Sequence, residues 1–238
     1  MKVAGAVAFV TGTNRGIGAQ FVKALKVRGA AKIYAASRRG VTTEDGVTPV
    51  KLDITRPDQV AAAAALARDT IVLINNAGVN FNTPLLNAPS EENARVEMEV
   101  NYFGLLAMCR AFAPILRANG GGIIVNMLSI LGRVNLPLMG SLCASKAAGL
   151  SLAQGMRAQL AGQGTLVIGV MPGAVDTDMT KDFPPPKIAP ADVATAVMDA
   201  IEAGQEEVYP GDMAQGIARG LAVDPKSVEK EFAAYLPK

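Results

Sequence analysis

A glycine-rich stretch near the N-terminus, TGTNRGIG at residues 11–18, has the composition of a site for the pyrophosphate of a dinucleotide. Its glycines allow a tight turn and a close approach of the backbone, and a helix predicted from residue 16 would point its N–H groups at the phosphates. The spacing G-x3-G-x-G differs from the more common G-x-G-x-x-G, so an ordinary turn is the alternative. The residues expected to contact the cofactor here are Gly12, Asn14, Arg15, Gly16, Ile17 and Gly18.

The end of the second predicted strand, AASRR at residues 35–39, indicates which dinucleotide is bound. An Asp or Glu at this place usually binds the free ribose hydroxyls of NAD. Here Ser37 takes that place, Arg38 and Arg39 follow, and Arg15 lies within the glycine loop. Guanidinium groups bind a 2′-phosphate with paired hydrogen bonds, whereas a carboxylate would repel it. The sequence therefore favours NADP (NADPH) over NAD. The alternative is that these arginines are only solvated surface residues.

Short apolar runs alternate with longer helical patterns along the chain. The runs are apolar throughout, which is typical of strands buried on both faces, and their alternation with helices predicts a parallel, doubly wound sheet. The 238 residues, half of them hydrophobic, fit one α/β domain over residues 1–238. Helices are expected at residues 16–28, 57–68, 91–118, 140–161 and 190–203, a proline-containing substrate loop at residues 179–190, and a C-terminal helix and tail at residues 211–238.

The composition argues against several classes of partner and site. The net charge is +2 without a basic run, so neither nucleic acid nor an anionic membrane surface is an expected partner. No apolar run approaches the length of a membrane span. The chain has no histidine, which removes His-based metal sites and Ser-His-Asp hydrolysis, and no metal is expected. Cys109 and Cys143 are expected to be buried free thiols of a cytoplasmic protein.

Seven motifs follow one another in order along residues 3–210: TGTNRGIG, LDIT, NNAG, VNYFG, SILG, SLCASKAA and MPGAVDTDM. Each is loose alone, but together they are highly specific, and the chain resembles the short-chain dehydrogenase/reductase family. The resemblance implies a single Rossmann-like domain with a mostly parallel seven-stranded sheet and helices on both faces, usually assembled as a homodimer or homotetramer. It also implies hydride transfer between a nicotinamide cofactor and a carbonyl or alcohol carbon.

The same resemblance assigns further cofactor contacts, motif by motif. Two of them have a plain structural alternative, because Asp53 could cap the turn before Pro57 and Pro172 with Gly173 could simply end a strand. The residues implied to contact the cofactor are Asp53, Ile54, Asn75, Ala77, Gly78, Pro172, Gly173, Val175 and Thr177, together with Lys146.

The family's catalytic set of Asn, Ser, Tyr and Lys is matched by Asn101, Ser129 and Lys146. By the resemblance, Asn101 helps to organise a water connected to the lysine, and Ser129 hydrogen-bonds the substrate oxygen. Lys146 binds ribose hydroxyls and lowers the pKa of the tyrosine. That tyrosine should stand four residues before Lys146, where this chain has Leu142. By sequence position no other tyrosine can replace it; the four lie at residues 34, 102, 209 and 235.

Leu142 cannot donate the proton that a reduced carbonyl oxygen needs, and losing such an acid typically costs about 10²–10⁴-fold in rate. Three functions follow. The first is an NADPH-dependent reductase of a small hydrophobic carbonyl whose tyrosine has been replaced. The second is a reductase of cyclic imine or iminium C=N bonds, which needs no phenol. The third is a catalytically silent NADPH-binding sensor or scaffold. The apolar residues expected either to form the substrate pocket or to be ordinary core are Leu128, Leu136, Met139, Leu142 and Met171.

Overall fold

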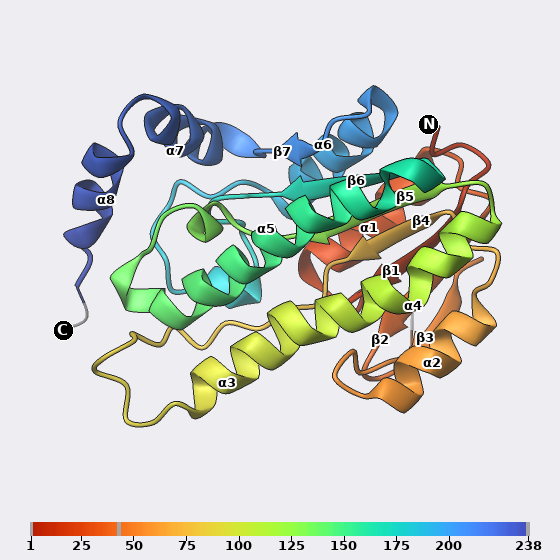
Figure 1. Ribbon diagram of the computed structural model, residues 1–238, viewed down its shortest axis with the longest axis horizontal. Helices are drawn as coiled ribbons and strands as arrows, with labels where there is room; N and C mark the ends of the chain where they lie inside the picture. Colours follow the sequence, from red (N-terminus) through yellow and green to blue (C-terminus); the bar gives the residue numbers. More distant parts are fainter. Residues whose placement is uncertain (1, 42–43, 237–238) are drawn as a thin grey trace.

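Runs of valine, isoleucine, leucine and alanine form the strands of one sheet in the computed structural model, which describes residues 2–41 and 44–236 (Figure 1). Neighbouring strands are parallel throughout, in the order β3-β2-β1-β4-β5-β6-β7. The predicted single-domain, doubly wound Rossmann-like fold is confirmed, and the described sheet is wholly parallel. Its strands are β1 (Val7–Thr11), β2 (Lys32–Ser37), β3 (Thr48–Lys51), β4 (Val72–Asn75), β5 (Gly122–Met127), β6 (Thr165–Val170) and β7 (Glu207–Val208).

Helices cover both faces of the sheet, and a separate hydrophobic core fills each side. On one face Phe21 of α1 packs in the same core as Val197 of α6. On the other face α2, α4 and α5 share a core in which Phe112 stacks on Phe9, with ring centroids 4.8 Å apart. The helices are α1 (Gly16–Val27), α2 (Pro57–Leu66), α3 (Glu92–Met98), α4 (Leu105–Ala118), α5 (Gly140–Leu160), α6 (Pro190–Ala203), α7 (Gly211–Val223) and α8 (Pro225–Ala233).

The single helix expected at residues 91–118 is divided in the structure. A π-helical segment, η1 (Glu99–Gly104), joins α3 to α4 and contains Asn101. Such segments are uncommon and are frequent at functional sites. The apolar pattern continues through the segment, so periodicity alone does not reveal it. The division matters because η1 carries one of the residues matched to the catalytic set.

The C-terminal segment, predicted as a helix and tail, forms two helices up to residue 233. The break falls at Asp224, whose carboxylate accepts hydrogen bonds from the backbone N–H groups of Lys226 (3.1 Å) and Ser227 (3.0 Å), with Pro225 at the first helical position. Asp followed by Pro is a helix-start signal that could have been read from the sequence. Residues 237–238 of the predicted segment lie outside the described residues. No helix among the described residues is long and apolar enough to cross a membrane.

The carboxyl ends of the strands meet at one edge of the sheet. β1 pairs with both β2 and β4, so the chain winds in opposite directions from this point and leaves a crevice beyond the ends of β1 and β4. The glycine loop follows β1, residues 76–80 follow β4, Ser129 follows β5 and Pro172 follows β6. Motifs that are up to about 160 residues apart along the chain are therefore brought to one place.

Candidate functional site

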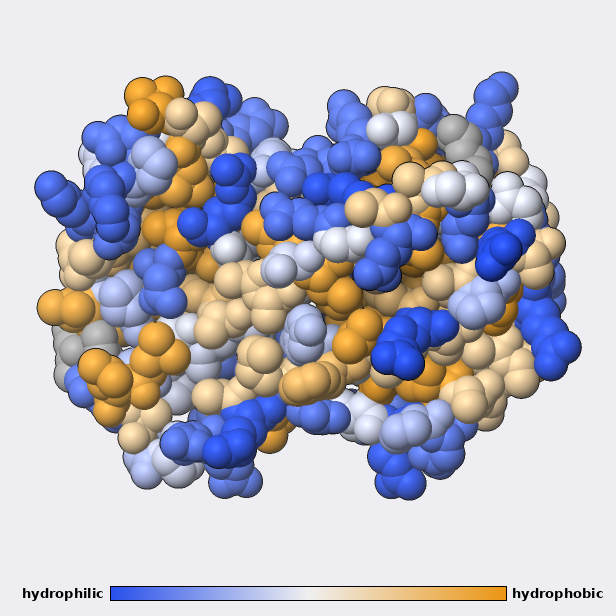
Figure 2. All heavy atoms as spheres, viewed as in Figure 1, coloured by the Kyte–Doolittle hydropathy of each residue, from blue (hydrophilic) through white to orange (hydrophobic). Residues whose placement is uncertain are grey.

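A cavity of about 2170 Å³ runs along this edge of the sheet. One end is formed by the glycine loop and the end of β2, and the other by α5, the loop after β6 and the C-terminal helices. Figure 2 shows apolar side chains gathered at the left of the molecule, where Figure 1 places α7, α8 and the loop after β4. The cavity is thus polar and glycine-rich where a dinucleotide would lie and more apolar toward the C-terminal helices.

The glycine loop has the backbone geometry that its sequence predicts. Gly12 and Gly16 have φ of 71° and 57°, in the left-handed region that favours glycine. Arg15 stands at the N-cap of α1 with extended backbone, and its side chain makes no capping hydrogen bond, so the first N–H groups of the helix are left for a ligand. Asn76 supports the loop by donating to the carbonyl oxygens of Thr11 (3.0 Å) and Gly12 (3.1 Å). The loop therefore fits a pyrophosphate.

Gly18→Ala is expected to destabilise the fold by about 1–3 kcal/mol, because an added Cβ would lie 2.1 Å from the carbonyl oxygen of Gly12 and would force the backbone to move. Gly155→Ala is the matched control on α5. Its Cβ would meet nothing within 4 Å, so the same substitution should stabilise the helix by about 0.5–1 kcal/mol. Urea unfolding of both variants checks the pair. Equal effects at the two positions would contradict the close packing at Gly18.

The same end of the cavity carries the predicted arginines. Ser37 is buried at the end of β2 and accepts a hydrogen bond from Gly40 N–H (3.2 Å), while the exposed side chains of Arg38 and Arg39 line the cavity. Arg15 also lines it, but its guanidinium pairs with Asp178 at 2.7 Å. Arg38 and Arg39 are thus the arginines placed for a phosphate at this end.

Asp53 fixes the turn before α2 and also lines the cavity. Its Oδ1 accepts hydrogen bonds from the backbone N–H (3.0 Å) and the hydroxyl (2.8 Å) of Thr55, which fixes the turn before α2. Asp53 and Ile54 also line the cavity after β3. The turn therefore holds these two residues where they could meet an adenine.

Two predicted contact residues lie elsewhere. The side chain of Asn75 is buried beneath the sheet edge, where it donates to Asn126 Oδ1 at 3.0 Å, and Asn76 lines the cavity instead. A strand places successive side chains on opposite faces, so the first asparagine of the NNAG motif points inward. Met171 is fully buried in the core beside α5 and does not line the cavity. The remaining predicted cofactor and pocket residues all line it.

Asn101 and Lys146 lie on either side of Gly78. Asn101 accepts from Val79 N–H (3.0 Å) and donates to Val79 C=O (2.9 Å) and to Ser145 Oγ (3.0 Å). A Cβ added at Gly78 would lie 3.0 Å from Asn101 Oδ1 and 3.6 Å from Lys146 Nζ, so the two side chains come close together at this glycine. The structure therefore brings together residues that the sequence separates by up to 68 positions.

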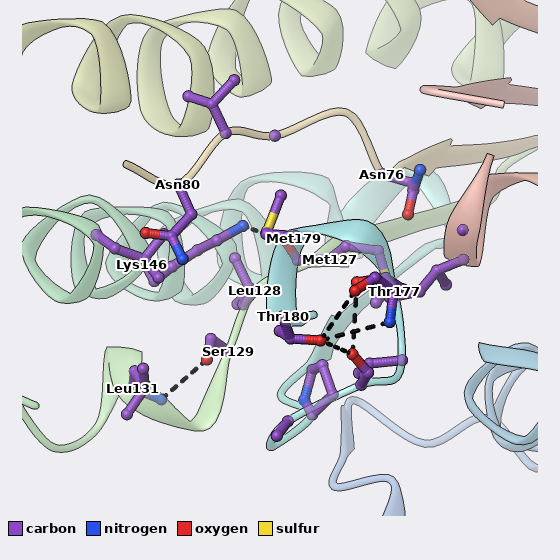
Figure 3. A pocket seen from close by; sticks show the side chains of 18 of the residues that line it. Asn76, Asn80, Met127, Leu128, Ser129, Leu131, Lys146, Thr177, Met179 and Thr180 are labelled. Carbon is purple, nitrogen blue, oxygen red and sulfur yellow. Dashed lines mark hydrogen bonds between the residues drawn. The ribbon is translucent and has the colours of Figure 1, made fainter. Parts of the chain in front are cut away.

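The amine of Lys146 donates to the carbonyl oxygen of Met127 at 2.9 Å, as Figure 3 shows. Burial lowers the pKa of Lys146 to about 8, and the negative charge of Glu97 opposes this shift. The group can therefore change its protonation state near neutral pH. Ser129 caps the short turn Ile130–Gly132 by accepting from Leu131 N–H at 3.1 Å, and its hydroxyl stays free to donate.

Leu142 stands one turn of α5 before Lys146 and is 7% exposed. It forms a small apolar cluster with Met139 and Cys143, and burial raises the pKa of the Cys143 thiol. Neither Leu142 nor the neutral thiol is an acid suited to protonating a substrate. The other apolar residues packed on this cluster are Leu131, Leu136, Leu138 and Phe183.

Several lining residues were not predicted. Asn80 follows the NNAG motif and lines the cavity together with Lys146 (Figure 3). Tyr235, just after α8, is the one tyrosine among the described residues that line the cavity. Neither carries a local sequence signal, because each reaches the cavity through the fold of a distant segment. The predicted substrate loop contributes Met179, Thr180, Phe183, Pro184 and Pro190, and the C-terminal helices contribute Met213, Ile217 and Phe232.

Both the fold and the sequence of this chain are similar to those of known proteins. The chain resembles a short-chain dehydrogenase from Burkholderia cenocepacia J2315, whose crystal structure contains NADP, with 52% identity over 98% of this chain and 99% of that one and a TM-score of 0.93. It is 30% identical to galactitol 2-dehydrogenase of Agrobacterium fabrum (94% of this chain, 85% of the relative) and 34% identical to sorbitol dehydrogenase of Cereibacter sphaeroides (74% and 73%). The model of the short chain dehydrogenase family matches residues 6–187. The chain belongs to this family of oxidoreductases.

Proposed function

We propose that this chain is an NADPH-dependent oxidoreductase that acts between a nicotinamide and a small hydrophobic carbonyl or alcohol, and that Leu142 slows its carbonyl reduction. The observation that carries the proposal is that Ser129 and Lys146 line the same cavity as the glycine loop. Asn101 is buried behind this wall, where it binds Val79 and lies close to Gly78. The tyrosine that completes the family's catalytic set has no counterpart at position 142 of the chain. Leu142 and its apolar neighbours form the wall where the tyrosine would stand.

NADPH is the proposed cofactor because Ser37 replaces the acidic residue that NAD enzymes use and two arginines face the cavity next to it. The related Burkholderia protein, crystallised with NADP, supports the same choice. Bound NADPH would supply the hydride. The loop after β6 would hold its nicotinamide end, and Lys146 would bind its ribose. The proposed residues of that loop are Pro172, Gly173, Val175 and Thr177.

Arg38→Ala is expected to weaken NADPH binding about 10–100-fold while leaving NADH binding almost unchanged, because only NADPH carries the 2′-phosphate that the guanidinium would bind. Isothermal titration with both cofactors measures the two dissociation constants. Arg68→Ala, at an exposed site after α2, removes the same charge and should change neither constant. Equal losses for NADPH and NADH would contradict a phosphate-binding role for Arg38.

In the proposed reaction Ser129 donates a hydrogen bond to the substrate oxygen, and the Lys146 ammonium, which lines the same cavity, is the source of the proton. A hydroxyl is too weak an acid to complete the proton transfer readily, so the proton would pass from Lys146 through water. This route is slower than direct donation by a phenol. Carbonyl reduction is therefore proposed to be slow but not absent.

Reduction of a cyclic iminium is the second candidate, favoured by the apolar wall at Leu142. An iminium already carries its proton, so hydride delivery needs no acid. A lysine with a pKa of about 8 also repels the cationic substrate less than a fully charged one would. Turnover of NADPH with a panel of hydrophobic ketones, aldehydes and cyclic imines tests both candidates. Activity on imines alone would select the second.

The proposal also includes assembly and location. We expect a homodimer or homotetramer, as the family suggests, and exposed Phe103 and Val96 on the α3–α4 side are apolar residues that an interface would cover. Analytical ultracentrifugation tests this. We place the protein in the cytoplasm, where the buried thiols of Cys109 and Cys143 would stay reduced.

A further inference from the structure

Glu97 is the one charged residue among the described residues whose side chain is fully buried. It lies near the end of α3, and its Oε1 accepts a hydrogen bond from the backbone N–H of Phe81 at 2.7 Å. No described protein group donates to its Oε2. Burying a carboxylate costs free energy unless it is paired with a cation or well hydrogen-bonded. A single hydrogen bond from a backbone N–H does not offset that cost. We therefore expect the Glu97 carboxylate to interact with a further partner.

The segment after β4 is held between Glu97 and the catalytic residues. Asn101, four residues after Glu97, binds both the N–H and the C=O of Val79, and Glu97 binds the N–H of Phe81. Asn80 lies between these two attachments and, like Lys146, lines the cavity (Figure 3). The two side chains thus fix the cavity wall that faces the lysine.

Among the described residues on the elements packed around Glu97, Lys146 is the cation whose charge interacts with that of Glu97. On α5 the groups that interact with its charge are Lys146 and Cys143. On α3, Arg95 is exposed and paired with Glu91 at 2.6 Å, and residues 79–83 carry no charge. Burial lowers the pKa of Lys146, and the Glu97 carboxylate acts in the opposite direction. Each charge therefore stabilises the other across the boundary between α3 and α5.

We propose that Glu97 is a positioning residue for the proposed chemistry: its carboxylate is the internal counter-charge of Lys146 and anchors the segment that holds Asn80 beside it. This inference rests on the proposed function only for its kinetic consequence. Without the carboxylate the lysine would lose its proton at a lower pH. Protonated Lys146, the proposed source of the proton in carbonyl reduction, would then be depleted within the neutral range.

Glu97→Gln is the direct test, because glutamine keeps the size of the side chain and an acceptor for Phe81 N–H but removes the charge. The pKa of Lys146 is measured in the full-length protein by ¹³C NMR of the lysine ε-carbons, with the Lys146 signal assigned by its loss in Lys146→Met. We expect Glu97→Gln to lower that pKa by about one unit. Glu92→Gln, exposed on the same helix, removes an equal charge and should leave it unchanged.

The kinetic counterpart is the pH profile of kcat/KM for ketone reduction, whose alkaline limb should move to lower pH by the same amount in Glu97→Gln.

A Lys146 pKa in Glu97→Gln equal to that in the Glu92→Gln control would overturn the proposal. Glu97 would then only hold Phe81 in place. If Glu97→Gln does not fold, the reciprocal measurement decides. Lys146→Met should then have a lower free energy of unfolding than the exposed control Lys23→Met, because it leaves the buried carboxylate without its counter-charge, and equal free energies from urea unfolding overturn the pairing. Because NMR needs no turnover, a chain that shifts as expected but reduces nothing would refute only the proposed function.

Discussion

Replacing Leu142 by tyrosine is expected to raise kcat for hydrophobic ketones by about 10²–10⁴-fold. The tyrosine would stand one helical turn before Lys146, with its hydroxyl at the cavity that Leu142 now lines. The lysine's charge would lower the pKa of the phenol, so that it could protonate the oxygen as hydride arrives. Steady-state NADPH oxidation by the two proteins, with one ketone series and one cyclic imine series, measures the gain.

Two controls make this result specific to proton donation. The dissociation constant for NADPH and the urea midpoint should be nearly equal in the two proteins, which excludes a gain through binding or folding. Tyr235→Phe, in the parent chain, tests whether the tyrosine that already lines the cavity supplies the proton. An unchanged kcat for ketones in Leu142→Tyr would contradict the proposed effect of Leu142. Loss of the residual activity in Tyr235→Phe would contradict it as well.

Lys146→Met is expected to lower kcat/KM for ketones by about 10²-fold or more, because it removes the only cation found among the described residues beside the substrate end of the cavity. In the parent chain the rate should be highest below pH 8 and should fall about tenfold per pH unit above it, as the Lys146 ammonium loses its proton. The Lys146→Met variant should not show this decrease in rate above pH 8. Rates over a range of pH values measure both effects.

Lys146→Arg separates charge from proton donation, since a guanidinium keeps its charge at every pH used but does not release a proton. It should therefore show a flat and low profile. Lys23→Met, exposed on α1, is the matched control and should keep the parent profile. An alkaline limb that survives in Lys146→Met would assign the titration to another group and contradict the proposed role of the lysine.

Much of the fold follows from local signals. Apolar strand runs, glycine positions and helix starts lie close together in the sequence, and five predicted helices begin within one residue of their observed starts. The motifs that carry Ser129 and Lys146 meet at one cavity because parallel strands all end at one edge. Such information is carried by the order of the elements and needs no knowledge of side-chain packing.

The structural features that the sequence does not predict depend on tertiary contacts. Asn75 and Asn76 are identical residues, and only the direction of the strand end decides that Asn76 lines the cavity. Glu97 sits in an ordinary helical sequence, and its burial results from the packing of α3 against α5. The π-helical segment at Asn101 is likewise invisible in the apolar pattern. Each of these depends on which segments the fold places side by side.

Transfer of deuterium from the cofactor to the product is the direct measure of oxidoreductase function. The parent chain is incubated with NADPH deuterated at both positions of nicotinamide C4 and with the ketone and imine series, and the products are analysed by mass spectrometry. We predict one deuterium on the reduced carbon for every NADPH oxidised, slowly with ketones and faster after Leu142→Tyr. NADPH that binds at the arginine end of the cavity but transfers deuterium to no substrate in either protein would contradict an oxidoreductase function and leave a silent NADPH-binding protein.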